Sequence, residues 1–191
     1  MDGSPSDLTG DSTGTPIGGI RTSSPLPLVD ETLLATTRYL QALTQLDDES
    51  AARPSVLPGW TRSHVIAHLS RNADAFTQVL RQVAGGEPAH MYASTATRVE
   101  DIEETLRTHD FDGLREDAEE ACARLAGELT ACDSDPGAPY TRLAGGEESW
   151  PLESVGRRRR TEVEIHHADL DVGYRPAEWP TDFSLAIVKQ R

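Results

Sequence analysis

Two histidines and a glutamate are the residues of this chain whose types and spacing best suit a metal ion. Glu162 and His166 lie four residues apart in the segment TEVEIHH, so on a helix both side chains project from one face. His68 lies far earlier, in the segment HVIAHL. Two imidazoles and a carboxylate supply three protein ligands and leave a fourth position open for water or substrate, as in catalytic zinc sites. We therefore predict one divalent metal ion, with zinc expected, between an early and a late helix.

Neighbouring residues offer alternative ligands that spacing does not exclude. His64 precedes His68 by one helical turn, and His167 and Asp169 lie beside His166. We prefer His68 because it shares the apolar register of its helix, and His166 because of its spacing from the glutamate. The same donor types would also accept Ni, Co, Mn or Fe.

The remaining histidines and both cysteines are expected to take no part in chemistry. His90 falls in a predicted loop and His109 at a polar helix end, where a solvated role is expected. Cys122 and Cys132 would lie about 15 Å apart along one helix, too far for a disulfide. Their apolar helix face predicts reduced, inert thiols.

Helices with apolar residues at three- and four-residue spacing must position these side chains. The first predicted helix covers about 30–47 with Asp30 as its N-cap, and the second runs from Thr61 to the Gly85-Gly86 stop. A third begins near Ser94, and two more cover about 111–132 and about 151–172. Residues 136–146 are predicted to be a loop. No segment shows a competing strand alternation. The predicted fold class is therefore all-α, an antiparallel bundle whose interior can hold a metal.

Composition divides the chain into three parts. Residues 1–27 are rich in Gly, Ser, Thr and Pro, with too few apolar side chains to offset the entropy of ordering, so we expect a disordered tail. Residues 28–175 carry the helical patterns and form the predicted metal-binding bundle. Apolar spacing restarts at Phe183 just before the chain ends, so residues 176–191 are predicted to begin a truncated C-terminal segment.

Charge and hydropathy exclude several classes of protein. The 191 residues carry a formal net charge of -14, which argues against a phosphate-backbone partner, so no nucleic acid is expected. The run Arg157 to Arg160 is predicted to be a solvated or ion-paired helix face. No stretch approaches the roughly 20 apolar residues of a membrane span, and no signal peptide is recognisable, so we expect no membrane partner and a cytoplasmic location.

Three segments carry a family resemblance: LPGWTRSHVIAHLSRNADAF, GGEPAHMYASTATRVEDIE and TEVEIHHADLDVGYRPAEWP. Together they resemble the mycothiol-dependent maleylpyruvate isomerase family, within the DinB/YfiT-like superfamily of metal-binding four-helix bundles. The resemblance covers about residues 28–185 and implies a DinB-like antiparallel four-helix bundle. It also implies that His68, Glu162 and His166 hold a divalent metal, usually zinc, and that Arg98 is a catalytic residue that grips an acidic substrate.

The resemblance further implies a thiol-dependent reaction. Members of the family use mycothiol, a low-molecular-weight thiol, to convert maleylpyruvate to fumarylpyruvate by thiolate addition, bond rotation and elimination. A metal ion favours the thiolate of a coordinating thiol, and covalent addition divides one high barrier into smaller ones. The expected partners are thus this thiol and a small acidic or electrophilic substrate. The alternatives are a mycothiol S-transferase acting on an electrophile and a non-catalytic metal-binding helical module.

Overall fold

The computed structural model describes residues 24–189, and most of them are helical. Residues 1–23 of the predicted tail lie outside the described residues. In chain order the elements are α1 (Val29–Leu43), α2 (Asp48–Ala51), α3 (Arg62–Ala84), β1 (Ala89–Tyr92), α4 (Thr95–Thr108), α5 (Phe111–Ala131), β2 (Pro139–Leu143), β3 (Ser149–Pro151), α6 (Ser154–Asp169), η1 (Pro176–Glu178) and α7 (Thr181–Lys189).

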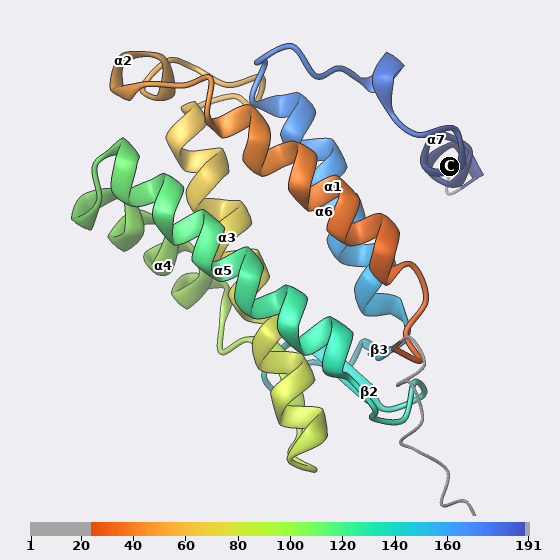
Figure 1. Cartoon of the computed structure of the whole chain (residues 1–191). Helices are drawn as coiled ribbons and strands as arrows, with labels where there is room; N and C mark the ends of the chain where they lie inside the picture. Colours follow the sequence, from red (N-terminus) through yellow and green to blue (C-terminus); the bar gives the residue numbers. More distant parts are fainter. Residues whose placement is uncertain (1–23, 190–191) are drawn as a thin grey trace, which may run out of the picture.

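Four long helices form the bundle, which confirms the predicted all-α class. Helix α1 lies along α6, and α3 lies along α5 (Figure 1). Helix α3 is central, because it packs against α4, α5 and α6. Gly156 allows the close approach of α6 to the segment before α1, since a Cβ there would collide with the carbonyl oxygen of Pro27. The hydroxyl of Thr32 on α1 donates to the carbonyl oxygen of Gly156 at 2.9 Å.

Side-chain caps explain why several helices begin where the sequence predicts. Thr61, Ser94 and Asp110 each accept a hydrogen bond from a backbone N–H in the first turn of α3, α4 and α5. The first helix differs from the prediction. It begins at Val29 without a side-chain cap, so Asp30 lies in its first turn instead, and it ends at Leu43. The separate short helix α2 follows, and this helix has its own capping box at Asp47.

A small sheet corrects the prediction that no strand competes with the helices. Strand β1 pairs with β2 in parallel, and β2 pairs with β3 antiparallel, at the end of the bundle where α1 and α6 begin (Figure 1). Part of the predicted loop at 136–146 is therefore strand β2, and His90 lies in β1 rather than in a loop. The strands are only three to five residues long, and β1 pairs with a strand far along the chain, so local alternation does not reveal them.

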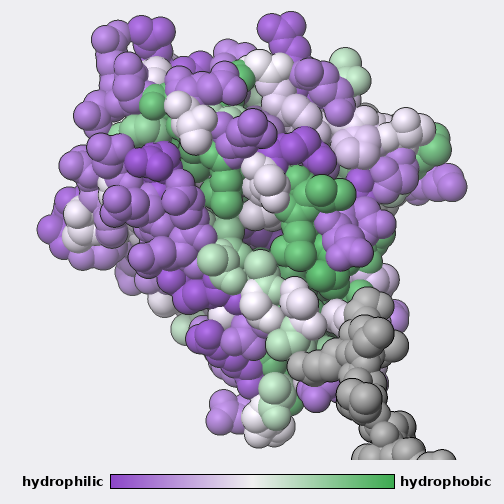
Figure 2. All heavy atoms as spheres, viewed as in Figure 1, coloured by the Kyte–Doolittle hydropathy of each residue, from purple (hydrophilic) through white to green (hydrophobic). Residues whose placement is uncertain are grey.

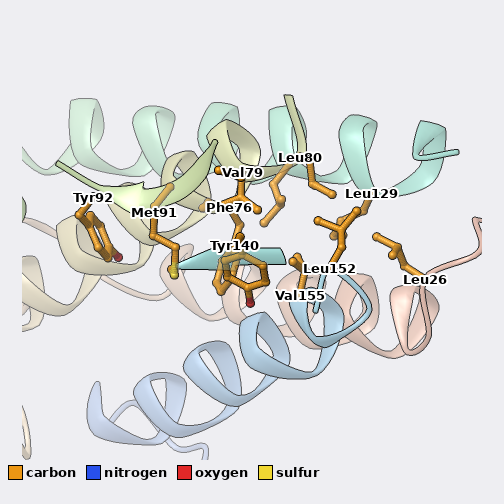
Figure 3. Close-up of a cluster of buried hydrophobic side chains, with 14 of the residues drawn as sticks. Leu26, Phe76, Val79, Leu80, Met91, Tyr92, Leu129, Tyr140, Leu152 and Val155 are labelled. Carbon is orange, nitrogen blue, oxygen red and sulfur yellow. The ribbon is translucent and has the colours of Figure 1, made fainter. Parts of the chain in front are cut away.

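The core consists of two clusters of buried hydrophobic residues. One, drawn in part in Figure 3, joins the sheet to α3, α5 and α6, and its labelled members are Leu26, Phe76, Val79, Leu80, Met91, Tyr92, Leu129, Tyr140, Leu152 and Val155. The other lies among α1, α3, α5 and α6, and its large side chains include Tyr39, Leu43, Ile66, Leu69, Phe111, Leu114, Val163 and Leu170. Outside, hydrophilic residues cover most of the face shown in Figure 2, and hydrophobic ones gather along the seam between α1 and α5.

The prediction of a solvated or ion-paired arginine face at 157–160 is wrong for Arg159, whereas Arg160 is ion-paired although buried. Arg159 is fully buried and donates to the carbonyl oxygen of Leu69 at 2.9 Å and to Oδ1 of Asn72 at 2.7 Å. Arg160 is also buried and donates to both carboxylate oxygens of Asp182. Polar partners on α3 and α7 make this burial possible, and those partners are brought near only by the tertiary fold.

The segment after α6 packs back onto that helix. Trp179 donates from its indole nitrogen to the carbonyl oxygen of Glu164 at 3.2 Å, and Phe183 on α7 is buried. The helix predicted for 151–172 ends earlier, at Asp169, and Asp171 adopts the left-handed conformation with φ 53°. The domain boundaries at 27/28 and 175/176 stay predictions. Among residues 24–189, no helix is long and apolar enough to cross a membrane.

Candidate metal centre

The structure brings His68, Glu162 and His166 together between α3 and α6. One ligand atom from each residue lies within 4.8 Å of the other two. Oε2 of Glu162 is 3.1 Å from Nε2 of His68 and 3.6 Å from Nε2 of His166. The two imidazole rings meet edge to face, with centroids 4.8 Å apart. The three predicted ligands thus converge on one point from two helices.

The two helices are held in this register by contacts next to the site. His68 is 3% exposed on α3, and the ring of Trp60 packs edge-on against it with centroids 5.6 Å apart. Arg159, one turn before Glu162 on α6, donates to the carbonyl oxygen of Leu69, the residue after His68. Because this hydrogen bond joins the ligand-bearing turns of α3 and α6, it fixes their relative position.

Burial and hydrogen bonding set the charges of the three residues. Burial alone would raise the pKa of Glu162, but hydrogen bonds and charges from His166 and His68 outweigh it and hold this pKa well below its usual range. Burial lowers the pKa of His68, and its contact with Glu162 opposes this only in part. Burial would also lower the pKa of His166, yet hydrogen bonds to Glu162 and Asp169 raise it. The site therefore combines an ionised carboxylate with imidazoles.

Each histidine has a further partner at its outward ring nitrogen. Nδ1 of His166 is 2.8 Å from Oδ2 of Asp169, a contact that orients the ring and leaves Nε2 facing Glu162. Nδ1 of His68 is 3.3 Å from Nη2 of Arg98 on α4. Asp169, weighed above as a ligand, thus lies behind His166 rather than beside Glu162.

The residues present fit a divalent metal ion. Two imidazole nitrogens and one carboxylate oxygen are the donor set of many catalytic zinc sites. Among residues 24–189, neither an arginine nor a lysine forms an ion pair with Glu162, so its charge is balanced only by the two histidines. The Asp169 contact to His166 is the carboxylate–histidine arrangement that accompanies many metal sites.

A small cavity of about 70 Å³ opens beside these residues. His68 and Glu162 form one wall together with Asn72 and Arg98. Residues of the sheet, of α3 and of α6 complete the lining, namely Phe76, Met91, Tyr92, Arg142, Trp150 and Arg158. A cavity of this volume has room for several water molecules or a few small polar groups. Met91 and Tyr92 reach it from the end of the cluster drawn in Figure 3.

The alternative histidines have other surroundings. Nδ1 of His64 is 2.7 Å from the hydroxyl of Thr61, as part of the cap of α3. His167 is 3% exposed and stacks on Tyr174 with centroids 4.1 Å apart, on another side of α6. Burial lowers the pKa of His167 to about 4.

The other histidines and the cysteines also lie away from the three converging residues. His90 is in β1, and Nδ1 of His109 contacts a backbone carbonyl at the end of α4. Both cysteines are free, and burial raises the pKa of the Cys122 thiol.

Sequence reasoning missed the sheet-side residues of the cavity. Arg158 lies four residues before Glu162, as Glu162 lies four before His166, so one helix stripe carries all three. That spacing was a usable signal. Arg142 and Trp150 carry no such signal, because β2 and β3 are too short to be recognised locally.

Comparisons with known proteins identify the family to which this chain belongs. Residues 33–171 match the family described as mycothiol maleylpyruvate isomerase N-terminal domain. The chain is similar to the crystal structure of the mycothiol-dependent maleylpyruvate isomerase, with 31% identity and a TM-score of 0.74, over 83% of this chain and 68% of that one. A histidine-to-alanine mutant of that isomerase matches with 30% identity, the same TM-score and the same coverage. No curated protein sequence matches significantly. The chain belongs to the mycothiol maleylpyruvate isomerase family.

Proposed function

We propose that this protein is a metal-dependent and mycothiol-dependent isomerase, which converts maleylpyruvate or a similar cis-enoic keto diacid to its trans isomer. One observation carries the proposal: His68, Glu162 and His166 converge beside a cavity that Arg98 also lines. The name of the similar solved structure supports the same thiol and the same substrate class.

His68, Glu162 and His166 would hold the divalent metal, with zinc as the expected ion. The bound ion would supply a positive charge that favours the thiolate form of a thiol beside it. Asp169 keeps the His166 ring oriented, and Trp60 packs against the His68 ring. These contacts limit the movement of the donors, so little ordering remains to be done when the site is loaded.

Arg98 would bind a carboxylate of the substrate. Its guanidinium lies next to His68 and 5.7 Å from the centroid of the Tyr92 ring, which holds it at the cavity wall. A guanidinium binds a carboxylate through two parallel N–H donors, so it fixes the direction of the substrate as well as its place. Holding a double bond in a fixed orientation against a thiolate would lower the barrier, because the encounter of the two groups no longer depends on chance collision.

The apolar wall of the cavity would exclude water from the reacting bond. Phe76 on α3 and Met91 on β1 are buried in the cluster that joins the sheet to the helices, and both line the cavity. A drier cavity strengthens the attraction between Arg98 and a carboxylate, because fewer water molecules screen it.

Assay of zinc-loaded protein with mycothiol and maleylpyruvate tests the proposal, with fumarylpyruvate followed by absorbance and chromatography. Fumarylpyruvate should form only when both zinc and mycothiol are present, and His68→Ala should abolish it. Stable thiol conjugates without fumarylpyruvate would refute the isomerase function and favour an S-transferase. Metal binding without any thiol chemistry would leave only a metal-binding module.

A further inference from the structure

Three arginines line the cavity, and none has a carboxylate partner among residues 24–189. Arg98 reaches it from α4, Arg142 from β2 and Arg158 from α6. Within residues 24–189, no aspartate or glutamate lies within ion-pair distance of these guanidinium groups. Nε of Arg158 is buried and has no hydrogen-bond partner in the same part of the chain.

The absence of partners is unusual for this protein. Acidic residues outnumber Lys and Arg by 32 to 18, and elsewhere most arginines on the helices pair with a carboxylate. Arg38, Arg71, Arg81, Arg107, Arg115, Arg124 and Arg160 all do so. Cations that gather at one cavity of an acidic protein without carboxylate partners indicate an anion-binding site, where a bound anion would balance their charge.

Stacking on Trp150 orients the guanidinium of Arg158 so that it can bind an anion. Its guanidinium carbon lies 3.5 Å from the centroid of the Trp150 ring. The N–H donors of a guanidinium lie in its plane, so a ring against one face leaves the donor edge free for a planar carboxylate. Burial lowers the pKa of Arg158, and the charges of Arg157 and Arg142 act in the same direction, whereas Tyr140 and Glu148 oppose it.

The distance along α6 suits a short diacid. Arg158 lies four residues before Glu162, which is about 6 Å along a helix at 1.5 Å per residue. Arg98 approaches from α4 beside His68. A substrate that lies over Glu162 therefore meets one guanidinium near His68 and another about one helical turn away, toward the sheet.

We propose that Arg158, supported by Arg142, is a second carboxylate subsite, so that Arg98 and Arg158 each hold one end of a dicarboxylate substrate. This proposal rests on the proposed function for the identity of the diacid. It makes Arg158 a specificity residue that selects diacids over monoacids.

The test compares a diacid with a monoacid in Arg158→Met. KM for maleylpyruvate should rise at least tenfold, whereas KM for cis-acetylacrylate, a cis-enone with a single carboxylate, should change less than twofold. Arg157→Met is the matched control, because Arg157 is the adjacent residue on α6, is exposed and does not line the cavity. It removes the same charge and should leave both KM values unchanged. Equal KM increases for the two substrates in Arg158→Met would overturn the subsite.

A binding experiment separates this proposal from the proposed function. By calorimetry, the zinc-loaded wild type should bind maleate, a dicarboxylate, at least tenfold more tightly than crotonate, a monocarboxylate. Arg158→Met should lose that preference and Arg157→Met should keep it. If the wild type fails to isomerise maleylpyruvate but shows this pattern, the proposed isomerase function is refuted and the carboxylate subsite is supported. If the wild type isomerises maleylpyruvate and Arg158→Met keeps the preference, only the subsite falls.

Two further variants guard against a folding defect in Arg158→Met. Arg158→Lys keeps the charge but not the planar donor edge, and it should restore only part of the lost maleate affinity. Arg142→Met changes an exposed residue of β2, so it should fold normally and weaken maleate binding by a smaller factor. Unchanged maleate affinity in both variants would overturn the proposal.

Discussion

Helix α6 carries two carboxylates, two residues apart, with opposite surroundings. Glu164 is fully buried, and its oxygens lie 2.6 Å from Nη2 of Arg38 and 2.5 Å from the hydroxyl of Tyr174. Glu162 has a side chain 36% exposed, and within the described part of the chain its carboxylate pairs only with two imidazoles. A guanidinium balances the charge of Glu164 and a phenol donates to its other oxygen, so this carboxylate belongs to a structural ion pair rather than to a group of metal donors. The comparison teaches that partners, rather than residue type, separate a structural glutamate from a candidate ligand.

The largest expected effect comes from the candidate ligand itself. Glu162→Gln should weaken zinc binding by more than about 100-fold, beyond the effect of changing an outer partner of a metal site. Turnover should be lost with it. Metal analysis of protein purified without added metal, followed by zinc titration, measures the change. A metal-free wild type would refute the metal centre.

A change of Glu164 should lower stability and leave zinc binding unaffected. Glu164→Gln should reduce the free energy of unfolding by about 3 kcal/mol, the lower end for breaking a buried ion pair. The lower end applies because Arg38 is partly exposed and Arg160 keeps Asp182. Urea denaturation measures the loss, and zinc stoichiometry should stay unchanged. Glu119→Gln, in an exposed pair with Arg115, is the control and should cost less than about 1 kcal/mol.

A smaller effect is expected from the partner behind His166. Asp169→Asn keeps the size of the side chain but removes the charge opposite Nδ1 of His166. Zinc affinity should fall by about 10- to 100-fold, less than for Glu162→Gln. Competition with a chromophoric chelator resolves the two variants. Equal losses for both would mean that Asp169 belongs among the ligands.

The smallest effect concerns pH and the Glu164 cluster. Burial and the hydrogen bond to Glu164 raise the pKa of Tyr174 to about 12. Between about pH 10 and this value the unfolded chain releases the phenol proton and the folded chain keeps it, so stability falls as pH rises. In Tyr174→Phe this part of the pH dependence should be missing. Urea denaturation of both proteins at several alkaline pH values gives the difference, and parallel curves would contradict the assignment.

Local sequence alone determined most of the helices and one face of the candidate site. Capping side chains such as Thr61 and Asp110 act within one turn, so the starts of α3 and α5 can be predicted without knowledge of tertiary contacts. The four-residue spacing of Glu162 and His166 likewise places both on one side of α6 in any fold. These features depend only on helix geometry.

Tertiary structure decided which histidine meets which carboxylate. His64 and His68 share a helix face, but packing leaves His64 on the cap of α3 and places His68 against Glu162. The sequence also did not predict three other features, namely the strands β1, β2 and β3, the burial of Arg159 and the stacking of Arg158 on Trp150. The pairing of β1 with β2 and the burial of Arg159 depend on partners distant in the chain. The β2–β3 pairing and the Arg158–Trp150 stacking join nearer residues, but the strands are too short for their alternation to be recognised.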